Sequence, residues 1–393
     1  MKPLWFSCII VKLFVIAVLS SSAFAHTKGV SLSRFGLIDL SLQANVVYAG
    51  LSKVNVDKIG DRHDNGFNLT SFDVSVTGET FQFPAKFALF LTFEQDAASI
   101  EEAFIFFHKL EAFTPLLSNF QATAGQFRAK FGQFNQIHDH EWFLADPPLV
   151  HTKFLGVDGV HLLGAEVTYQ PPISRFVQLA LSAQSPGAVQ SFPSAAEGVP
   201  ATFAAKKSDE IVLFPRVETF FDLTDNSNLA LGLSGGIGEN KRESDDKTHL
   251  IGVDFLYRWK GGTQPGWPYI RWLTEAIWAI RENPIVSAGA NKGLQVGNDV
   301  VGGFFSELGY RFTYRWQVTG RVDYVGIPKG NEDTEIRLTG ALRYYLNPVM
   351  KLNFQYEYGR PSGQDRPYHA FFIQLNVGIG TVTPGVGKFL DPF

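Results

Sequence analysis

Apolar and polar residues alternate with a period of two along most of this chain. Near the C-terminus, Leu352, Phe354 and Tyr356 alternate with Asn353 and Gln355. Successive side chains of a β-strand point to opposite faces, so this pattern predicts a strand with one apolar and one polar face. The same alternation recurs from the N-terminal third of the chain to its end, which indicates an all-β protein.

Read in this way, the sequence predicts sixteen strands. They span residues 34–48, 68–78, 82–93, 101–110, 119–130, 159–170, 174–185, 212–222, 227–238, 248–260, 267–281, 297–312, 314–325, 332–346, 349–359 and 367–380. The odd-numbered connections are mostly long and polar, at 49–67, 131–158, 186–211, 282–296 and 326–331, and the even-numbered ones are mostly short. Long loops on one rim and short turns on the other are typical of outer-membrane barrels.

Composition separates a membrane barrel from a soluble β-sandwich. The chain contains 36 Phe, its aromatic content is 14%, and its mean hydropathy is near zero. No run of about 18 apolar residues follows the first 25, which argues against a transmembrane helix. We therefore expect an antiparallel transmembrane β-barrel of about sixteen strands, with apolar side chains toward lipid and polar ones toward the lumen.

The two ends of the chain carry export and assembly signals. An apolar stretch after Lys2 ends in Ala23-Phe24-Ala25, which fits the cleavage pattern of a secretory signal peptide. We expect residues 1–25 to be removed and residues 26–393 to form one barrel domain, with no space for an N-terminal plug. The terminal Phe393 resembles the recognition signal of barrel-assembly machinery.

Cysteine and charge exclude several function classes. The single cysteine, Cys8, lies in the predicted signal peptide, so the mature chain has no thiol for a disulfide, a thiolate metal site or a nucleophile. The net charge of the whole chain is −4, and nothing in the distribution of Lys and Arg suggests nucleic-acid binding. We expect no cofactor.

The most distinctive segment is the third long loop, residues 131–158, with the strand ends beside it. It contains Phe131-Gly132, Asn135, the His138-x-His140 pair, Asp146-Pro147-Pro148 and a turn from Gly156 to Gly159. In these motifs the segment resembles the phosphate-selective porin O/P-like superfamily, over roughly residues 120–170. Elsewhere the likeness is architectural only.

This resemblance implies a passive outer-membrane pore for small hydrophilic solutes or ions. It also implies a third loop that folds into the barrel and narrows the pore, and a homotrimer in the membrane. The preference for phosphate does not carry over, because the inward-facing charges of this chain form no basic ladder. Acidic and basic residues nearly balance there, which favours weak selectivity.

Charged residues on the inward faces and in the third loop are the candidates for lining the pore. They are Arg128, Lys130, His138, Asp139, His140, Glu141, Asp146, Arg258, Glu307, Arg311, Arg315, Arg321, Arg337 and Arg343.

The histidine pair allows an alternative function. Two residues at i and i+2 of an extended loop point to the same side, and imidazole with carboxylate suits zinc or copper. His138 and His140 would then serve a channel specific for a divalent metal ion or another ligand. Anchoring of a folded loop by hydrogen bonds explains the same residues without a metal.

Two further functions remain open. A barrel enzyme would need a histidine beside a nucleophile, and the only hint is that His161 and His369 fall near strand ends. An adhesive surface protein would bind through long loops such as 49–67 and 186–211.

Overall fold

The computed structural model describes residues 30–32, 36–52, 64–80, 84–94, 97–186, 202–203, 210–240, 245–262, 268–283, 298–328, 334–347, 349–361 and 367–380. The predicted signal peptide, the terminal Phe393, and most of the 49–67 and 186–211 loops lie outside these residues.

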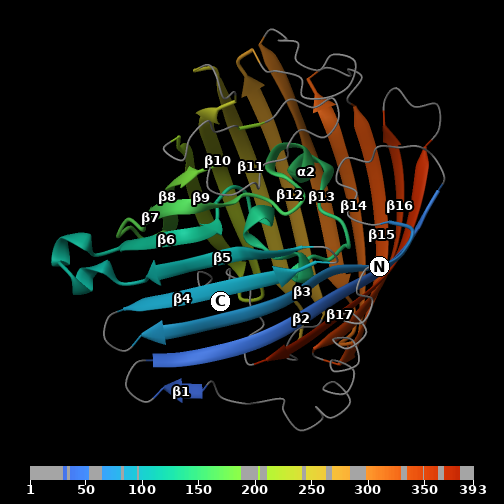
Figure 1. Cartoon of the computed structure of the whole chain (residues 1–393), viewed down its shortest axis with the longest axis horizontal. Helices are drawn as coiled ribbons and strands as arrows, with labels where there is room; N and C mark the ends of the chain where they lie inside the picture. The colour runs from blue at the N-terminus through green and yellow to red at the C-terminus, as the bar shows by residue number, and fades with distance from the viewer. Residues whose placement is uncertain are drawn as a thin grey trace, which may run out of the picture.

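Sixteen antiparallel strands close into a barrel (Figure 1). They are β2 (Gly36–Leu51), β3 (Gly66–Thr80), β4 (Ala85–Phe93), β5 (Ala98–Phe107), β6 (Phe120–Arg128), β7 (His161–Tyr169), β8 (Phe176–Ser185), β9 (Val212–Thr224), β10 (Ser227–Glu239), β11 (Lys247–Lys260), β12 (Tyr269–Arg281), β13 (Asp299–Arg311), β14 (Trp316–Ile327), β15 (Glu335–Asn347), β16 (Met350–Pro361) and β17 (Tyr368–Gly380). Each strand pairs with its neighbours in sequence, and β17 pairs with β2 to close the ring.

These strands match the sixteen predicted ones in order, so the predicted fold class is confirmed. A short extra strand, β1 (Val30–Leu32), pairs with the start of β2 and was not predicted. The connection from β5 to β6 holds two 3-10 turns, η2 (Leu110–Ala112) and η3 (Pro115–Leu117).

The two faces of the wall follow the alternation of the sequence. In β15, Ile336 and Leu338 point outward and are 37% and 44% exposed, whereas Arg337 and Thr339, which alternate with them, are buried inside. An apolar outer face and a polar inner face are the arrangement of a membrane barrel. None of the helices among the described residues is long and apolar enough to span a membrane.

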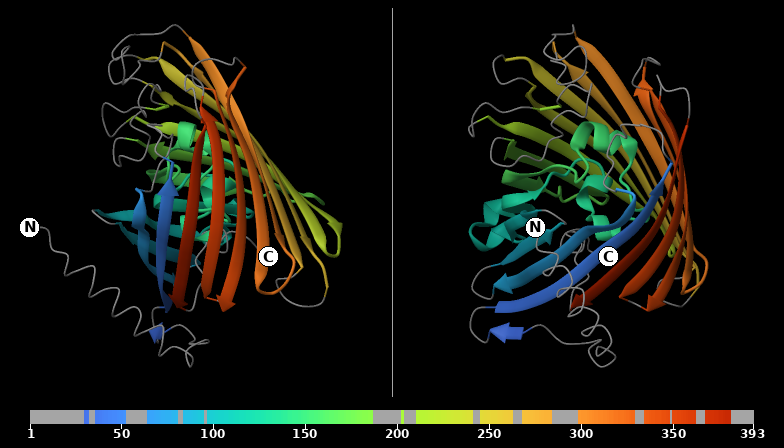
Figure 2. Two further views of the ribbon diagram at one scale, coloured as in Figure 1. Left: turned by 90° about the vertical axis from the view of Figure 1, so that its right-hand side faces the viewer. Right: turned by 45° about the vertical axis from the view of Figure 1, so that its right-hand side comes forward.

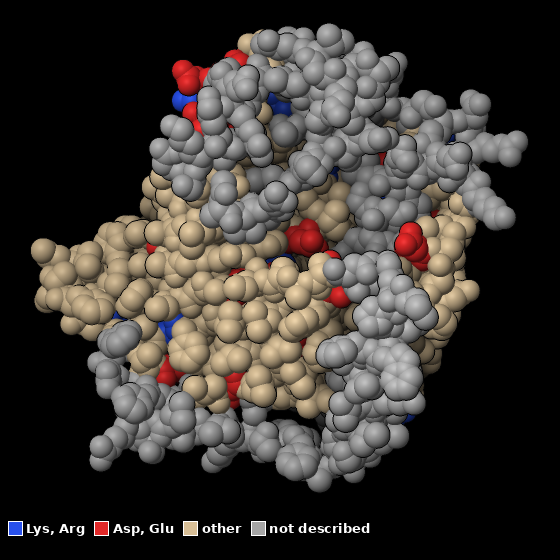
Figure 3. All heavy atoms as spheres, in the orientation of Figure 1, with Lys and Arg blue, Asp and Glu red and all other residues tan. Residues whose placement is uncertain are grey.

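The wall is uneven in height. Strands β4 to β8 have only 9 or 10 residues each, whereas β9 to β17 have 12 to 14. Figure 2 shows the long strands rising on one side of the barrel above the short ones. The front wall in Figure 3 is covered mainly by uncharged residues, in agreement with a lipid-facing surface.

The connection between β6 and β7 lies inside the barrel (Figure 2), so the predicted inward folding of the third loop is confirmed. It contains η4 (Phe134–Gln136), η5 (Asp139–Glu141) and the helix α2 (Leu149–Leu155). All seven residues of α2 are buried. We call residues 129–160 the inner loop below.

Candidate functional site

The inner loop is closed at its neck by Asn135. The Asn135 amide donates to the carbonyls of Ala129 and Val160, at 2.8 and 3.1 Å, and its oxygen accepts from the Val160 backbone nitrogen at 2.8 Å. Gly159 has a φ of +73°, and a Cβ there would lie 2.3 Å from the Asn135 oxygen. The Asn135 and Gly159 of the sequence motif therefore join the two ends of the loop.

Replacing Asn135 by alanine is expected to lower the thermal stability of the folded barrel. The change leaves the buried Val160 backbone nitrogen without a partner, at a cost of roughly 1–3 kcal/mol, and removes one of two donors from the Ala129 and Val160 carbonyls. Thermal unfolding of the variant in detergent, followed by circular dichroism, measures this loss. The matched replacement Asn228→Ala, at a strand end below the loop, should leave the melting temperature nearly unchanged.

The middle of the inner loop packs an apolar core against the barrel wall. Phe131, Phe134 and α2 contribute to a buried cluster that also contains Phe305 of β13. The ring of Phe134 lies 5.6 Å from that of Phe305, edge to face. This packing removes apolar side chains from the water of the lumen, which stabilises the folded loop by about 25 cal/mol per Å² buried.

Glu275 of β12 is the central polar anchor of the loop. One of its oxygens accepts from the backbone nitrogens of Gln133 and Phe134 at 2.5 and 2.6 Å, and the other faces His151 Nε2 at 3.3 Å. Gly132 has a φ of +65°, and a Cβ there would lie 2.5 Å from a carboxylate oxygen. The glycine allows the backbone to approach the carboxylate.

The opposite part of the wall binds the second half of the loop. Arg321 of β14 donates to the carbonyls of Asp146 and Pro147, and Asp323 accepts from the Leu149 backbone nitrogen at 3.0 Å. Gln355 of β16 accepts from the Ala145 nitrogen at 2.8 Å. The loop is therefore fixed to strands on both sides of the lumen.

Arg343 and Lys351 complete this attachment. Arg343 of β15 donates to the Trp142 carbonyl at 2.7 Å, and Lys351 of β16 donates to the His140 carbonyl. These contacts hold the segment between η5 and α2 against β15 and β16.

The two predicted histidines have different partners. His138 lies between two carboxylates of β5, with Nδ1 3.2 Å from Glu101 and Nε2 3.1 Å from Glu102. Burial alone would lower the pKa of His138, but the facing Glu101 and Glu102 raise it to about 10, so the ring is charged at neutral pH. His140 instead faces Asp73 and Asp139, although the two imidazole rings stack at 5.4 Å.

Several predicted pore-lining charges are neutralised by ion pairs. Lys130 pairs with Glu166 at 2.9 Å, and Arg128 pairs with Glu101 at the loop neck. Arg337 of β15 lies 3.3 Å from Glu357. Glu307 is also buried and is paired with two arginines, Arg271 and Arg321, at 3.1 and 3.8 Å.

The remaining predicted residues differ in position. The Asp146 carboxylate accepts from the Gln355 amide at 3.4 Å, and Glu141 is half-buried in η5. Arg315 lies in the exposed turn before β14, where it donates to the Tyr344 hydroxyl at 2.7 Å. Tyr344 is on the outward phase of β15, so the expectation that Arg315 lines the pore is corrected: residues of a turn do not continue the strand alternation.

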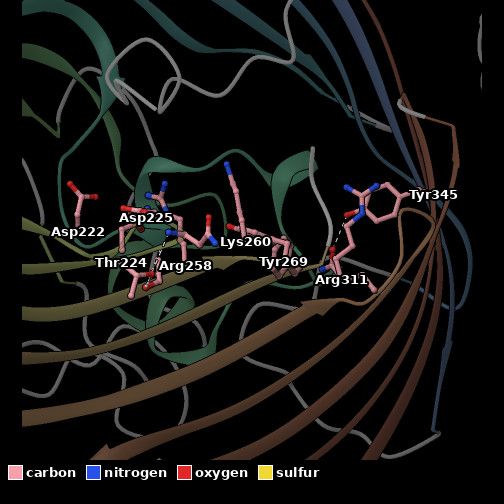
Figure 4. A pocket seen from close by; sticks show the side chains of 13 residues that line it. Asp222, Thr224, Asp225, Arg258, Lys260, Tyr269, Arg311 and Tyr345 are labelled. Atoms are coloured by element: carbon pink, nitrogen blue, oxygen red, sulfur yellow. Dashed lines mark hydrogen bonds between the residues drawn. The ribbon is translucent and has the colours of Figure 1, made fainter. Parts of the chain in front are cut away.

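Below the inner loop the lumen opens into a cavity of about 510 Å³. Its lining residues are Phe143, Asp222, Thr224, Asp225, Asn226, Ser227, Asn228, Arg258, Lys260, Tyr269, Arg311, Gln317 and Tyr345. Figure 4 shows the acidic residues Asp222 and Asp225 at one end of this cavity and Arg311 with Tyr345 at the other. The Arg311 guanidinium lies 3.9 Å from the centre of the Tyr345 ring.

Sequence reasoning included Arg258 and Arg311 among the lining residues but missed Lys260 and Tyr345. Both lie on the inward phase of their strands, two residues after Arg258 and Arg343. The period-two pattern extended to the strand ends would have identified them. Phe143 was missed for another reason: it belongs to the inner loop, where no repeating pattern sets the side-chain direction.

Comparison with known proteins supports the architecture. No family model matches the chain. It is 24% identical over 346 residues to an uncharacterized protein of Aquifex aeolicus, covering 81% of this chain and 69% of that protein. The anion-selective porin of Comamonas acidovorans superposes with a TM-score of 0.57, at 8% identity, covering 88% of this chain and all of the porin.

Two other solved structures agree. The channel DcaP of Acinetobacter baumannii gives a TM-score of 0.54 at 10% identity, covering 90% of this chain and all of DcaP. Pseudomonas putida OprB gives 0.53 at 12% identity, covering 89% and 95%. The chain has the fold of the outer-membrane porins. At these identities the likeness concerns the fold alone, and it does not single out a phosphate-selective group.

Proposed function

We propose that this chain is a bacterial outer-membrane porin through which small hydrophilic solutes or ions diffuse passively. The observation that carries the proposal is a closed sixteen-stranded barrel, apolar outside and polar inside, with the inner loop folded across its lumen. A barrel of this size is wide enough for an aqueous channel, and an inward loop narrows it. The lipid of the outer membrane would surround the apolar face.

Planar-bilayer recording tests the proposal. Purified protein added to one side of the membrane should produce stepwise increases of current that persist without an energy source. Heat-unfolded protein at the same concentration is the control and should give no steps. If folded protein inserts into liposomes but gives no conductance, the pore proposal is wrong.

The unpaired charges of the lower cavity support weak ion selectivity. Among the described residues, Lys260 and Arg311 form no ion pair with a carboxylate, and Asp222 and Asp225 form none with Lys or Arg. With Arg258, three cations and two acids line the cavity. Opposite charges in near balance give a weak preference for either sign of ion.

Assembly partners follow from the same proposal. One of the similar structures, OmpT of Vibrio cholerae, is described in a trimer form, with a TM-score of 0.50 at 8% identity, covering 88% of this chain and 99% of OmpT. We propose a homotrimer for this chain, inserted by the barrel-assembly machinery.

A relation to the phosphate-selective porin O/P-like group rests on the inner-loop motifs, and phosphate itself is not proposed as the solute.

The other functions gain no support from the site. A metal-selective path through His138 and His140 would need both rings, but His138 is held between Glu101 and Glu102. For a barrel enzyme, the His369 ring contacts a tyrosine hydroxyl, Tyr356, at 2.6 Å rather than a serine. The contacts of His138 and His369 hold the inner loop and two neighbouring strands in place, and they require neither a metal ion nor a substrate.

A further inference from the structure

The inner loop and the wall bring three metal-ligating side chains together on the side opposite α2. Asp73 of β3 faces Asp139 and His140 of η5, and one ligand atom from each residue lies within 4.8 Å of the others. His140 Nδ1 lies 3.7 Å from an oxygen of Asp73 and 3.7 Å from an oxygen of Asp139. Asp73 and the adjacent pair Asp139 and His140 come from two segments more than 60 positions apart in the sequence.

Asp73 has unused capacity to bind a cation. It is only 6% exposed, and its Oδ1 is buried without a hydrogen-bond partner. No Lys or Arg among the described residues pairs with this carboxylate, whose ion-pair contact is His140. An unsatisfied buried carboxylate oxygen is costly, and a cation bound at this point would remove that cost.

Ser71 holds the two carboxylates in a common orientation. Its hydroxyl lies 3.1 Å from Asp73 Oδ2 and 3.3 Å from Asp139 Oδ2, so it can donate to either. Groups that orient ligating carboxylates are a regular part of metal sites. Asp139 is half-buried, which leaves the cluster open to the lumen.

The distances suit a small divalent cation. Zinc binds oxygen and nitrogen at about 2.0–2.2 Å, so two ligand atoms of a tetrahedral site lie about 3.3–3.5 Å apart. The two separations of 3.7 Å from His140 Nδ1 require a shift of a few tenths of an ångström, and the two carboxylates, whose ligand atoms lie within 4.8 Å of each other, would move together on binding. Two carboxylates and one imidazole match zinc and related first-row divalent ions.

We propose that Asp73, Asp139 and His140 form a site for a divalent transition-metal ion, such as zinc, that ties the inner loop to β3. Water would complete the coordination from the lumen. His138 is not a ligand, because both its ring nitrogens face carboxylates of β5. The site depends on the docked inner loop and not on whether the lumen conducts.

Isothermal titration of the folded, chelator-treated barrel with zinc chloride tests this site. The wild-type chain should bind one zinc ion, and zinc should raise its melting temperature. Asp73→Asn, Asp139→Asn and His140→Gln should each weaken binding by at least about tenfold. Asp73 is buried, so the Asp73→Asn variant can fail to fold. Asp139 is only half-buried, and the Asp139→Asn variant then provides the test.

Matched controls separate this site from general metal adsorption. Asp222→Asn removes a lumen carboxylate elsewhere and should bind zinc as the wild type does. Cobalt in place of zinc should give a visible absorption spectrum that His140→Gln abolishes. The proposal is overturned if the folded wild type takes up no zinc, or if the Asp139 and His140 variants bind it equally well. Planar-bilayer conductance is scored separately.

Discussion

Replacement of Glu275 by alanine is expected to release the inner loop and increase single-channel conductance by about twofold or more. The carboxylate accepts two backbone hydrogen bonds and faces His151, all in a buried setting. Its loss leaves these groups unsatisfied at a cost on the order of 3–5 kcal/mol. The melting temperature should fall together with the change in conductance, and bilayer recording and thermal unfolding measure the two effects.

Two further variants test whether the lost hydrogen bonds of Glu275 cause the change in conductance. Glu275→Gln keeps one oxygen that accepts from Gln133 and Phe134, so its effect should be smaller than that of alanine. Glu79→Ala, at the far end of β3, removes a half-exposed glutamate that does not touch the inner loop and should behave as wild type. A Glu275→Ala channel with unchanged conductance and stability would show that this anchor does not hold the loop.

The second large effect is expected at the lower cavity. The double change Lys260→Glu and Arg311→Glu replaces two cations of the cavity lining by acids, in addition to the existing Asp222 and Asp225. The cavity is then lined by four acids and one remaining cation, Arg258, and this net negative charge attracts cations and repels anions. The reversal potential in a tenfold KCl gradient should move from near zero toward the potassium equilibrium potential.

Arg315→Glu provides the matched control for this change. Arg315 is only four positions from Arg311, but it lies in the exposed turn beside Tyr344. Its reversal should leave ion selectivity as in the wild type. Equal shifts in the Arg315 variant and the double variant would mean that surface charge, and not the lower cavity, sets the potential. The shift should shrink at high salt, because salt screens exposed charges.

The strands were predictable because a wall between lipid and water imposes one repeating constraint on every residue. In β15, the polar Arg337 faces the lumen and the apolar Leu338 faces outward, so polarity alone predicts the side of the wall. The same alternation of polar and apolar residues located all sixteen strands. The inner loop has no such rule. Its partners are chosen by the closed barrel: Trp142 meets Arg343 across 201 positions of sequence. Only the presence of a folded inward loop was predictable.

The partners of His138 and His140 could not be predicted from the local sequence. An extended backbone from His138 to His140 would present both rings to one ligand, but η5 begins at Asp139 and curls the chain. Each ring then meets carboxylates from a different strand, His138 on β5 and His140 on β3. The residue types indicated polar contacts for the loop, whereas the identity of each partner came from the long-range closure of the barrel.

The attachment of the inner loop to opposite walls also dictates the order of assembly. The Leu149 nitrogen is bound by Asp323, 174 positions later in the chain, so α2 has no docking surface until the C-terminal strands exist. Contacts of such sequence separation form slowly and late. Until then Phe131, Phe134 and Phe154 have no wall to pack against. If the chain is exported as the proposed function requires, we expect a holdase to shield these aromatics until the ring of strands has closed.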